Sequence, residues 1–181
     1  MQLFAISGII NALVSIGLGL IVVLKNWREK NNLIFFLMTV SLFIWGFGYW
    51  EWQLASNYSS ALFWIRFLSI GSLFIPVFFF HWVVVLLNKK GWVKTIVLIS
   101  YLSGAVISLF FSSDLFIPSV EGKLFFPYWP NAGLLYGIYV CLIYVGLISL
   151  SLYFLFKSYK TEKDNNKKGQ ILYIITGALL G

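Results

Sequence analysis

Long apolar runs separated by short polar segments fill most of this 181-residue chain. Each run is long enough for a helix to cross about 30 Å of hydrocarbon, which takes roughly 20 residues. The pattern predicts five complete membrane spans, at about 3–24, 33–54, 62–87, 92–111 and 132–156. A sixth run, 171–181, has only eleven residues and begins a further span. We therefore expect an all-α fold, a polytopic transmembrane helical bundle with five complete spans and the start of a sixth.

The composition agrees with a membrane protein. Hydrophobic residues make up 60% of the chain and charged residues 10%, whereas soluble domains carry about 25% charged residues. The sixth run stops where a span would still lie in hydrocarbon, which would leave carbonyl groups without partners. We therefore interpret the sequence as a fragment of a larger bundle.

The basic residues predict an orientation. Eleven of the thirteen Lys and Arg residues lie in or beside the first, third and fifth connections, and the second connection, 55–61, has none. By the positive-inside rule the odd connections are cytoplasmic and the N-terminus is outside. The net charge of +7 thus follows topology, and we do not expect nucleic-acid binding.

Small and hydroxyl residues recur at four-residue spacing in two spans. Ser7, Asn11 and Ser15 share one face of the first span, and Ser100, Gly104 and Ser108 share one face of the fourth. Such stripes let helices approach closely and hydrogen-bond across the contact, so both are predicted helix interfaces, with a ligand-lining role as the alternative. The aromatic- and proline-rich fourth connection, 112–131, is expected to pack over the outer mouth of the bundle.

The third predicted span carries three unusual residues. An ionisable group within a span needs a partner or a water-filled cavity, and this span contains both Arg66 and His81. We expect Arg66 to pair with Glu51 at the outer mouth, either structurally or as part of a ligand pocket. His81 is expected to hydrogen-bond a neighbouring side chain, and Pro76 is a structural kink or a hinge.

Motifs for chemistry are absent from the sequence. It contains no Gly-x-Ser-x-Gly, no His-Glu-x-x-His and no P-loop. With one histidine and one cysteine, the chain offers neither a multi-histidine metal site nor a cysteine cluster. We expect no cofactor, no metal and no catalytic residue, so that the chain is not itself an enzyme.

Several segments together resemble a known family. They are Asn-Asn-Leu-Ile-Phe-Phe-Leu-Met-Thr-Val-Ser-Leu-Phe-Ile-Trp-Gly-Phe-Gly-Tyr at 31–49, Trp-Ile-Arg-Phe-Leu-Ser-Ile-Gly at 64–71, Ile-Pro at 75–76, Phe-His-Trp at 80–82 and Lys-Gly-Gln-Ile-Leu-Tyr-Ile-Ile-Thr-Gly at 168–177. In these segments the chain resembles the N-terminal seven-transmembrane (7TM) sensor region of bacterial membrane histidine kinases. The resemblance implies a single sensor domain over residues 1–181, in the bacterial plasma membrane, ahead of a cytoplasmic kinase or, in some relatives, a diguanylate cyclase. It also implies a homodimer.

The function expected from this resemblance is sensory input to a two-component system. A small molecule or a membrane state would act at the outer half of the bundle and move the last span against the output domain. Membrane-embedded His81 is not the phosphoacceptor. The alternatives are a transporter or permease subunit and a small structural membrane protein. Candidate ligand contacts are Trp50, Glu51, Trp64, Arg66, Tyr128 and Trp129. Aromatic residues at these depths are more often interfacial anchors, which is the alternative for the four aromatic ones.

Overall fold

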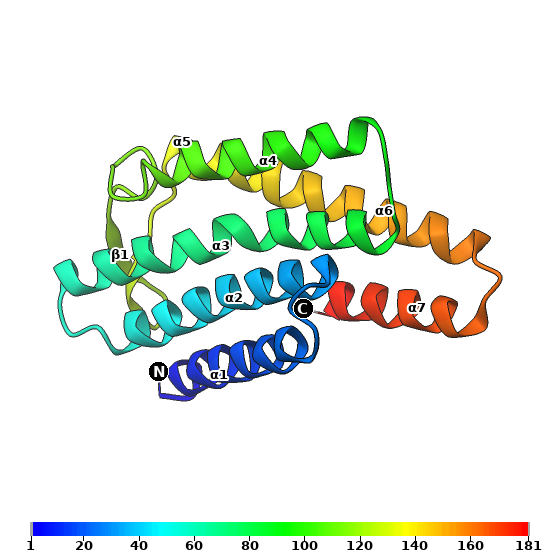
Figure 1. Cartoon of the computed structure of the whole chain (residues 1–181). Helices are drawn as coiled ribbons and strands as arrows, with labels where there is room; N and C mark the ends of the chain where they lie inside the picture. Colours follow the sequence, from blue (N-terminus) through cyan, green and yellow to red (C-terminus); the bar gives the residue numbers. More distant parts are fainter. Residues whose placement is uncertain (1, 181) are drawn as a thin grey trace.

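Helices account for most of the computed structural model, which describes residues 2–180 (Figure 1). They are α1 (Gln2–Lys25), α2 (Lys30–Leu54), α3 (Tyr58–Leu86), α4 (Trp92–Ser108), α5 (Leu134–Ile138), the π-helix η1 (Tyr139–Tyr144), α6 (Val145–Thr161) and α7 (Asn165–Leu180). Four continuous helices are long and apolar enough to cross a membrane: Leu3–Lys25, Lys30–Leu54, Tyr58–Leu86 and Leu134–Thr161. A shorter apolar helix, Trp92–Ser108, joins them. The predicted membrane helical bundle is confirmed.

Helix α3 is the centre of the bundle. It packs against α2, α4 and α6, and 56% of its most apolar window is buried, against 17% for α1. Gly71 permits the close approach of α2, because a Cβ atom there would lie 2.5 Å from the Ser41 carbonyl oxygen. Val77 and Phe80 farther along α3 are fully buried. The side chains of α3 therefore meet most of the other elements.

Small residues bring α1 and α2 together. A Cβ atom on Gly46 would lie 2.9 Å from the carbonyl oxygen of Gly8, and Ala12 beside it is fully buried. The predicted interface stripe of α1 is therefore shifted by one position. Ser7 and Asn11 are exposed, and Asn11 instead lines, with Ser15, a cavity of about 440 Å³ that also touches α2, α3, α6 and α7.

The predicted interface stripe of α4 is buried at two of its three positions, Ser108 being only half-buried, and it meets α3 at Gly104. Ser100 and Gly104 are buried, and a Cβ atom on Gly104 would lie 3.2 Å from the ring of Phe74. Helix α4 ends at Ser108, three residues before the predicted end of this span at 111. The chain then continues in tight turns, in one of which the Phe110 N–H donates to the Ile107 carbonyl at 3.0 Å.

A β-hairpin covers one end of the bundle, in the segment expected to pack over its mouth. Its strands are β1 (Val120–Lys123) and β2 (Phe126–Pro130), and they pair antiparallel with Val120 opposite Pro130. The sequence analysis did not predict these strands. Just before them, Phe116 and Ile117 are buried to 2% exposure or less and anchor the segment in the core. Figure 1 shows the hairpin at the end of the bundle where α2 turns into α3.

Candidate functional site

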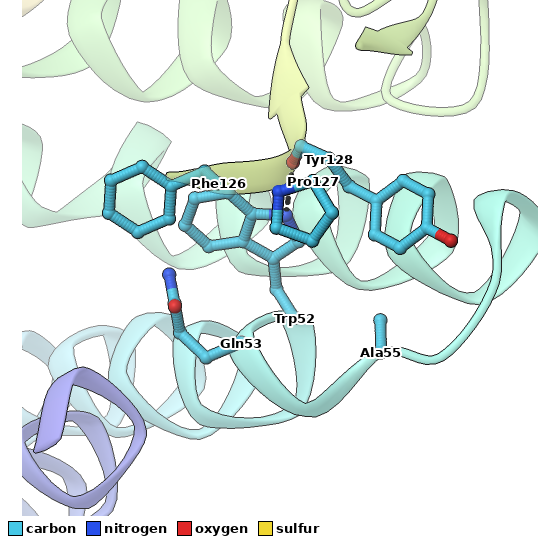
Figure 2. A pocket seen from close by; sticks show the side chains of 6 residues that line it. All are labelled: Trp52, Gln53, Ala55, Phe126, Pro127 and Tyr128. Carbon is cyan, nitrogen blue, oxygen red and sulfur yellow. Dashed lines mark hydrogen bonds between the residues drawn. The ribbon is translucent and has the colours of Figure 1, made fainter. Parts of the chain in front are cut away.

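The hairpin is held to α2 by a tryptophan. Trp52, only 7% exposed, donates its indole N–H to the carbonyl oxygen of Tyr128 at 2.8 Å (Figure 2). The ring also stacks on Phe126, with centroids 6.0 Å apart. A buried indole N–H needs an acceptor, so this bond fixes where β2 lies over the bundle.

Gln53, the next residue of α2, is also buried beneath the hairpin. Figure 2 shows its side chain rising from α2 on the same side as Phe126. Its exposed fraction is 7%, and neither amide atom has a hydrogen-bond partner among the described residues. Burying an unpaired amide is unfavourable, so Gln53 lowers the stability of the packing between α2 and the hairpin.

Residues 112–131, which include the hairpin, are called the covering segment below. Arg66 forms the second link between the bundle and this segment. Its Nε and Nη2 donate to the carbonyl oxygen of Ile117 at 3.0 and 2.7 Å, and Nη2 also contacts Asp114 at 3.0 Å. The predicted pair with Glu51 is therefore wrong: the one salt bridge within residues 2–180 joins Arg66 to Asp114. The acid comes from the fourth connection because that segment folds back over α3, which loop order alone did not indicate.

Beneath the hairpin, α2, α3 and the start of α5 border a cavity of about 260 Å³. The polar side chains that α3 contributes to this cavity are Ser69 and Ser72. Both hydroxyls already donate hydrogen bonds within the helix, Ser69 to the Ile65 carbonyl at 2.7 Å and Ser72 to the Ser69 carbonyl at 3.0 Å. No charged residue lines it. The lining residues are Trp45, Ile65, Leu68, Ser69, Ser72, Ile117, Trp129, Pro130, Ala132 and Tyr136. Such a wall suits a small, uncharged, largely apolar molecule.

Ser72, which lines this cavity, lies one helical turn before Pro76 on α3. Pro76 has no N–H, so the carbonyl of Ser72 cannot make its usual hydrogen bond four residues on. The buried Tyr139, on η1, donates its hydroxyl hydrogen bond to that carbonyl. Tyr139 thus replaces the bond that proline removes. It joins the α3 wall of the cavity to the continuous helix Leu134–Thr161.

The six candidate ligand contacts fall in different places. Trp129 lines the cavity, and Tyr128 holds the hairpin through its backbone carbonyl. Trp50 and Trp64 pack their rings against Phe47 at 5.6 and 5.8 Å and do not line the cavity. Half-buried Glu51 does not line it either. Arg66 reaches it only indirectly, through the Ile117 carbonyl.

His81 lies away from this cavity, nearer the other end of α3. Its Nδ1 is 2.9 Å from the hydroxyl oxygen of Tyr101 on α4, and the two rings meet edge to face at 5.6 Å. Within residues 2–180, no group of three or more His, Cys, Asp or Glu side chains could hold a metal ion.

Sequence reasoning missed most of the cavity wall. Ser72 had a usable signal, because Pro76 leaves the carbonyl four positions earlier without its helical donor. Ser69 shares the α3 face of Ser72 at a spacing of three residues. Trp45 and Tyr136 carried no such signal, since their positions depend on how α2 and α5 pack around α3.

Comparison with known protein families identifies a match. A family model described as the N-terminal 7TM region of histidine kinase matches residues 8–181. Among curated proteins and among solved structures, none matches the chain.

Proposed function

The chain belongs to the family of N-terminal 7TM regions of histidine kinases, and we propose that it is the sensory input region of a bacterial two-component kinase. It is a multi-pass membrane region, and no catalytic domain lies within it. Family membership favours this function over a transporter subunit or a structural membrane protein. In this proposal residues 1–181 form one sensor domain that works as a homodimer, with the N-terminus outside and the output domain in the cytoplasm.

The observation that carries the proposal is the covered cavity beneath the hairpin. Its walls come from α2, α3, α5 and the covering segment, so a molecule bound there would contact parts of the chain that are far apart in sequence. At about 260 Å³ it is smaller than a typical drug-sized pocket of about 300–1,000 Å³. The proposed signal is therefore a small, uncharged, largely apolar compound.

The route from cavity to output runs through the contact between Tyr139 and Ser72. A ligand against Ser72 and Tyr136 would favour one packing of α3 against the helix that contains η1. A ligand can shift such an equilibrium only by its difference in affinity for the two packings. The continuous helix Leu134–Thr161 would carry the change to the opposite end of the bundle, where α7 begins.

Filling the cavity tests this function. Ala132→Trp adds a large ring at an exposed loop position of the cavity wall, and Ala105→Trp adds the same ring at an exposed position of α4 outside it. In the natural full-length protein, reconstituted in vesicles, Ala132→Trp should change autophosphorylation at least fivefold and remove any response to small apolar compounds. Ala105→Trp should behave like the unmodified protein. Equal behaviour of both variants would refute a sensory role for the cavity.

Orientation and output have separate tests. A reporter inserted at 56–57 should lie outside the cell and one inserted at 26–28 inside, and the reverse result would overturn the proposed topology. The coding sequence after Gly181 should complete a sixth helix and a seventh, followed by a phosphoacceptor helix and an ATP-binding domain. A stop codon there would contradict the sensor-kinase proposal while leaving the family membership intact.

A further inference from the structure

Another cavity opens at the other end of α3, among the basic residues. Its volume is about 500 Å³, and it lies between the start of α2, the end of α3 and the start of α4. The residues that line it are Lys30, His81, Val84, Val85, Asn88, Lys89, Lys94, Val97, Leu98 and Tyr101. None of them is acidic.

Two helices present matching faces to this cavity. His81, Val84 and Val85 follow one another at i, i+3 and i+4 on α3, and Asn88 lies in the turn just after that helix. On α4, residues 94, 97, 98 and 101 stand at i, i+3, i+4 and i+7. The two helices are consecutive and antiparallel, so Asn88 lies at the same end as Lys94. The bonded pair His81 and Tyr101 forms the deep end. At 1.5 Å per residue, the seven residues between the ends give a depth of roughly 10 Å.

Positive charge gathers at the shallow end. Lys30, Lys89 and Lys94 all line the cavity, and within residues 2–180 none of the three forms a salt bridge. Lys89 is half-buried, with Nζ 3.4 Å from the Ser158 hydroxyl oxygen and 5.6 Å from the Phe154 ring centroid. The helices that begin at Lys30 and Trp92 both lack a side-chain cap, so their first N–H groups add to the positive potential.

The deep end has the opposite character. Between the lysines and the His81–Tyr101 pair, the wall consists of Val84, Val85, Val97 and Leu98. Leu98 is 60% exposed on the outer surface of α4, where a membrane protein meets lipid. The cavity therefore joins a cationic mouth to an apolar passage that continues onto the lipid-facing surface.

We propose that this cavity binds an anionic phospholipid, with the phosphate among the three lysines and the start of an acyl chain along the valines. A cationic pocket between transmembrane helices at the basic side of the membrane suits such a headgroup. A free phosphate ion would use the lysines but gain nothing from the apolar wall. The bound lipid would join α2, α3 and α4 at the end of the bundle opposite the hairpin.

The test uses the purified full chain in detergent, titrated with dioctanoyl phosphatidylglycerol, dioctanoyl phosphatidylcholine and inorganic phosphate. Native mass spectrometry counts the bound molecules and gives the dissociation constants. Phosphatidylglycerol should bind at least tenfold more tightly than either other probe. Replacing Lys30, Lys89 and Lys94 together by Gln should weaken phosphatidylglycerol binding at least tenfold. The matched control replaces Lys160, Lys163 and Lys167 by Gln. It removes the same charge from exposed positions at the end of α6, between α6 and α7 and at the start of α7, and should change binding less than twofold.

A charge-neutral variant separates the lipid from the free ion and guards against misfolding. Val85→Trp narrows the apolar passage and leaves all three lysines in place. It should weaken phosphatidylglycerol binding at least fivefold and leave phosphate binding unchanged, while far-ultraviolet circular dichroism confirms the helix content. Equal loss in the two lysine triples would show only general surface attraction and overturn the proposal. Phosphate binding as tight as lipid binding, with no effect of Val85→Trp, would overturn the lipid assignment.

Discussion

Replacing Tyr139 by Phe tests whether this residue compensates for Pro76. The change deletes only the hydroxyl that donates to the Ser72 carbonyl, at a site that is 2% exposed. A buried acceptor left unpaired costs about 1–3 kcal/mol, while interhelical side-chain bonds in membranes average about 0.6 kcal/mol. We therefore expect a loss near 1 kcal/mol in the free energy of unfolding.

The second half of this test is a double-mutant cycle. Pro76→Ala restores the N–H that a helix directs at the Ser72 carbonyl, so in that background Tyr139→Phe should cost less than about 0.5 kcal/mol, a coupling of the size measurable between contacting residues. The assay is unfolding in mixed micelles with a denaturing detergent, followed by circular dichroism. Tyr153→Phe is the control, because Tyr153 is exposed on the same continuous helix and its hydroxyl makes no hydrogen bond to any residue between 2 and 180. An equal cost of Tyr139→Phe in both backgrounds would refute the reasoning.

Three further substitutions, measured by the same unfolding assay, address the links described above. Arg66→Met should cost about 1–3 kcal/mol by leaving a buried carbonyl unpaired, whereas Asp114→Asn should cost under about 1 kcal/mol because its side chain is 85% exposed; equal costs would make the ion pair the important contact. Gly71→Ala should destabilise the bundle by more than about 1 kcal/mol, since its Cβ would meet α2 backbone at 2.5 Å, while Gly146→Ala, with nothing within 4 Å, should be neutral or stabilising. Gln53→Met should stabilise the protein by about 1 kcal/mol by removing an unpaired buried amide, and a loss of stability would show that the amide has a partner.

The helices were predictable because the signal for a span is simple. An apolar run of sufficient length must form a helix in hydrocarbon, where every backbone group has to be paired within the segment. The covering hairpin was harder, because Phe125, Phe126 and Trp129 in an aromatic loop are equally consistent with interfacial anchoring. What distinguishes them is the indole bond from Trp52, a contact across 76 residues that no local pattern encodes.

For Arg66, the sequence indicated the need for a partner but not which group would provide it. Arg66 was correctly singled out as a residue that needs a partner, but Glu51 was chosen because it is near in sequence. The actual acceptors, Asp114 and the Ile117 carbonyl, come from a segment about fifty residues later. Charge patterning gives the end of the bundle at which a basic residue lies, and packing decides which lysines share a cavity.

The π-helical turn at Tyr139–Tyr144 also affects how related sequences should be aligned. A π-turn accommodates one residue more than an α-turn, and one residue corresponds to roughly 100° of rotation about a helix axis. A relative with a regular α-helix at this point would therefore be one residue shorter there. An ungapped alignment across it would rotate every assigned position from Val145 to Thr161 by about 100° about the helix axis, so that buried Leu147 and Ser151 would be matched with the equivalents of half-buried Ile148 and Leu152.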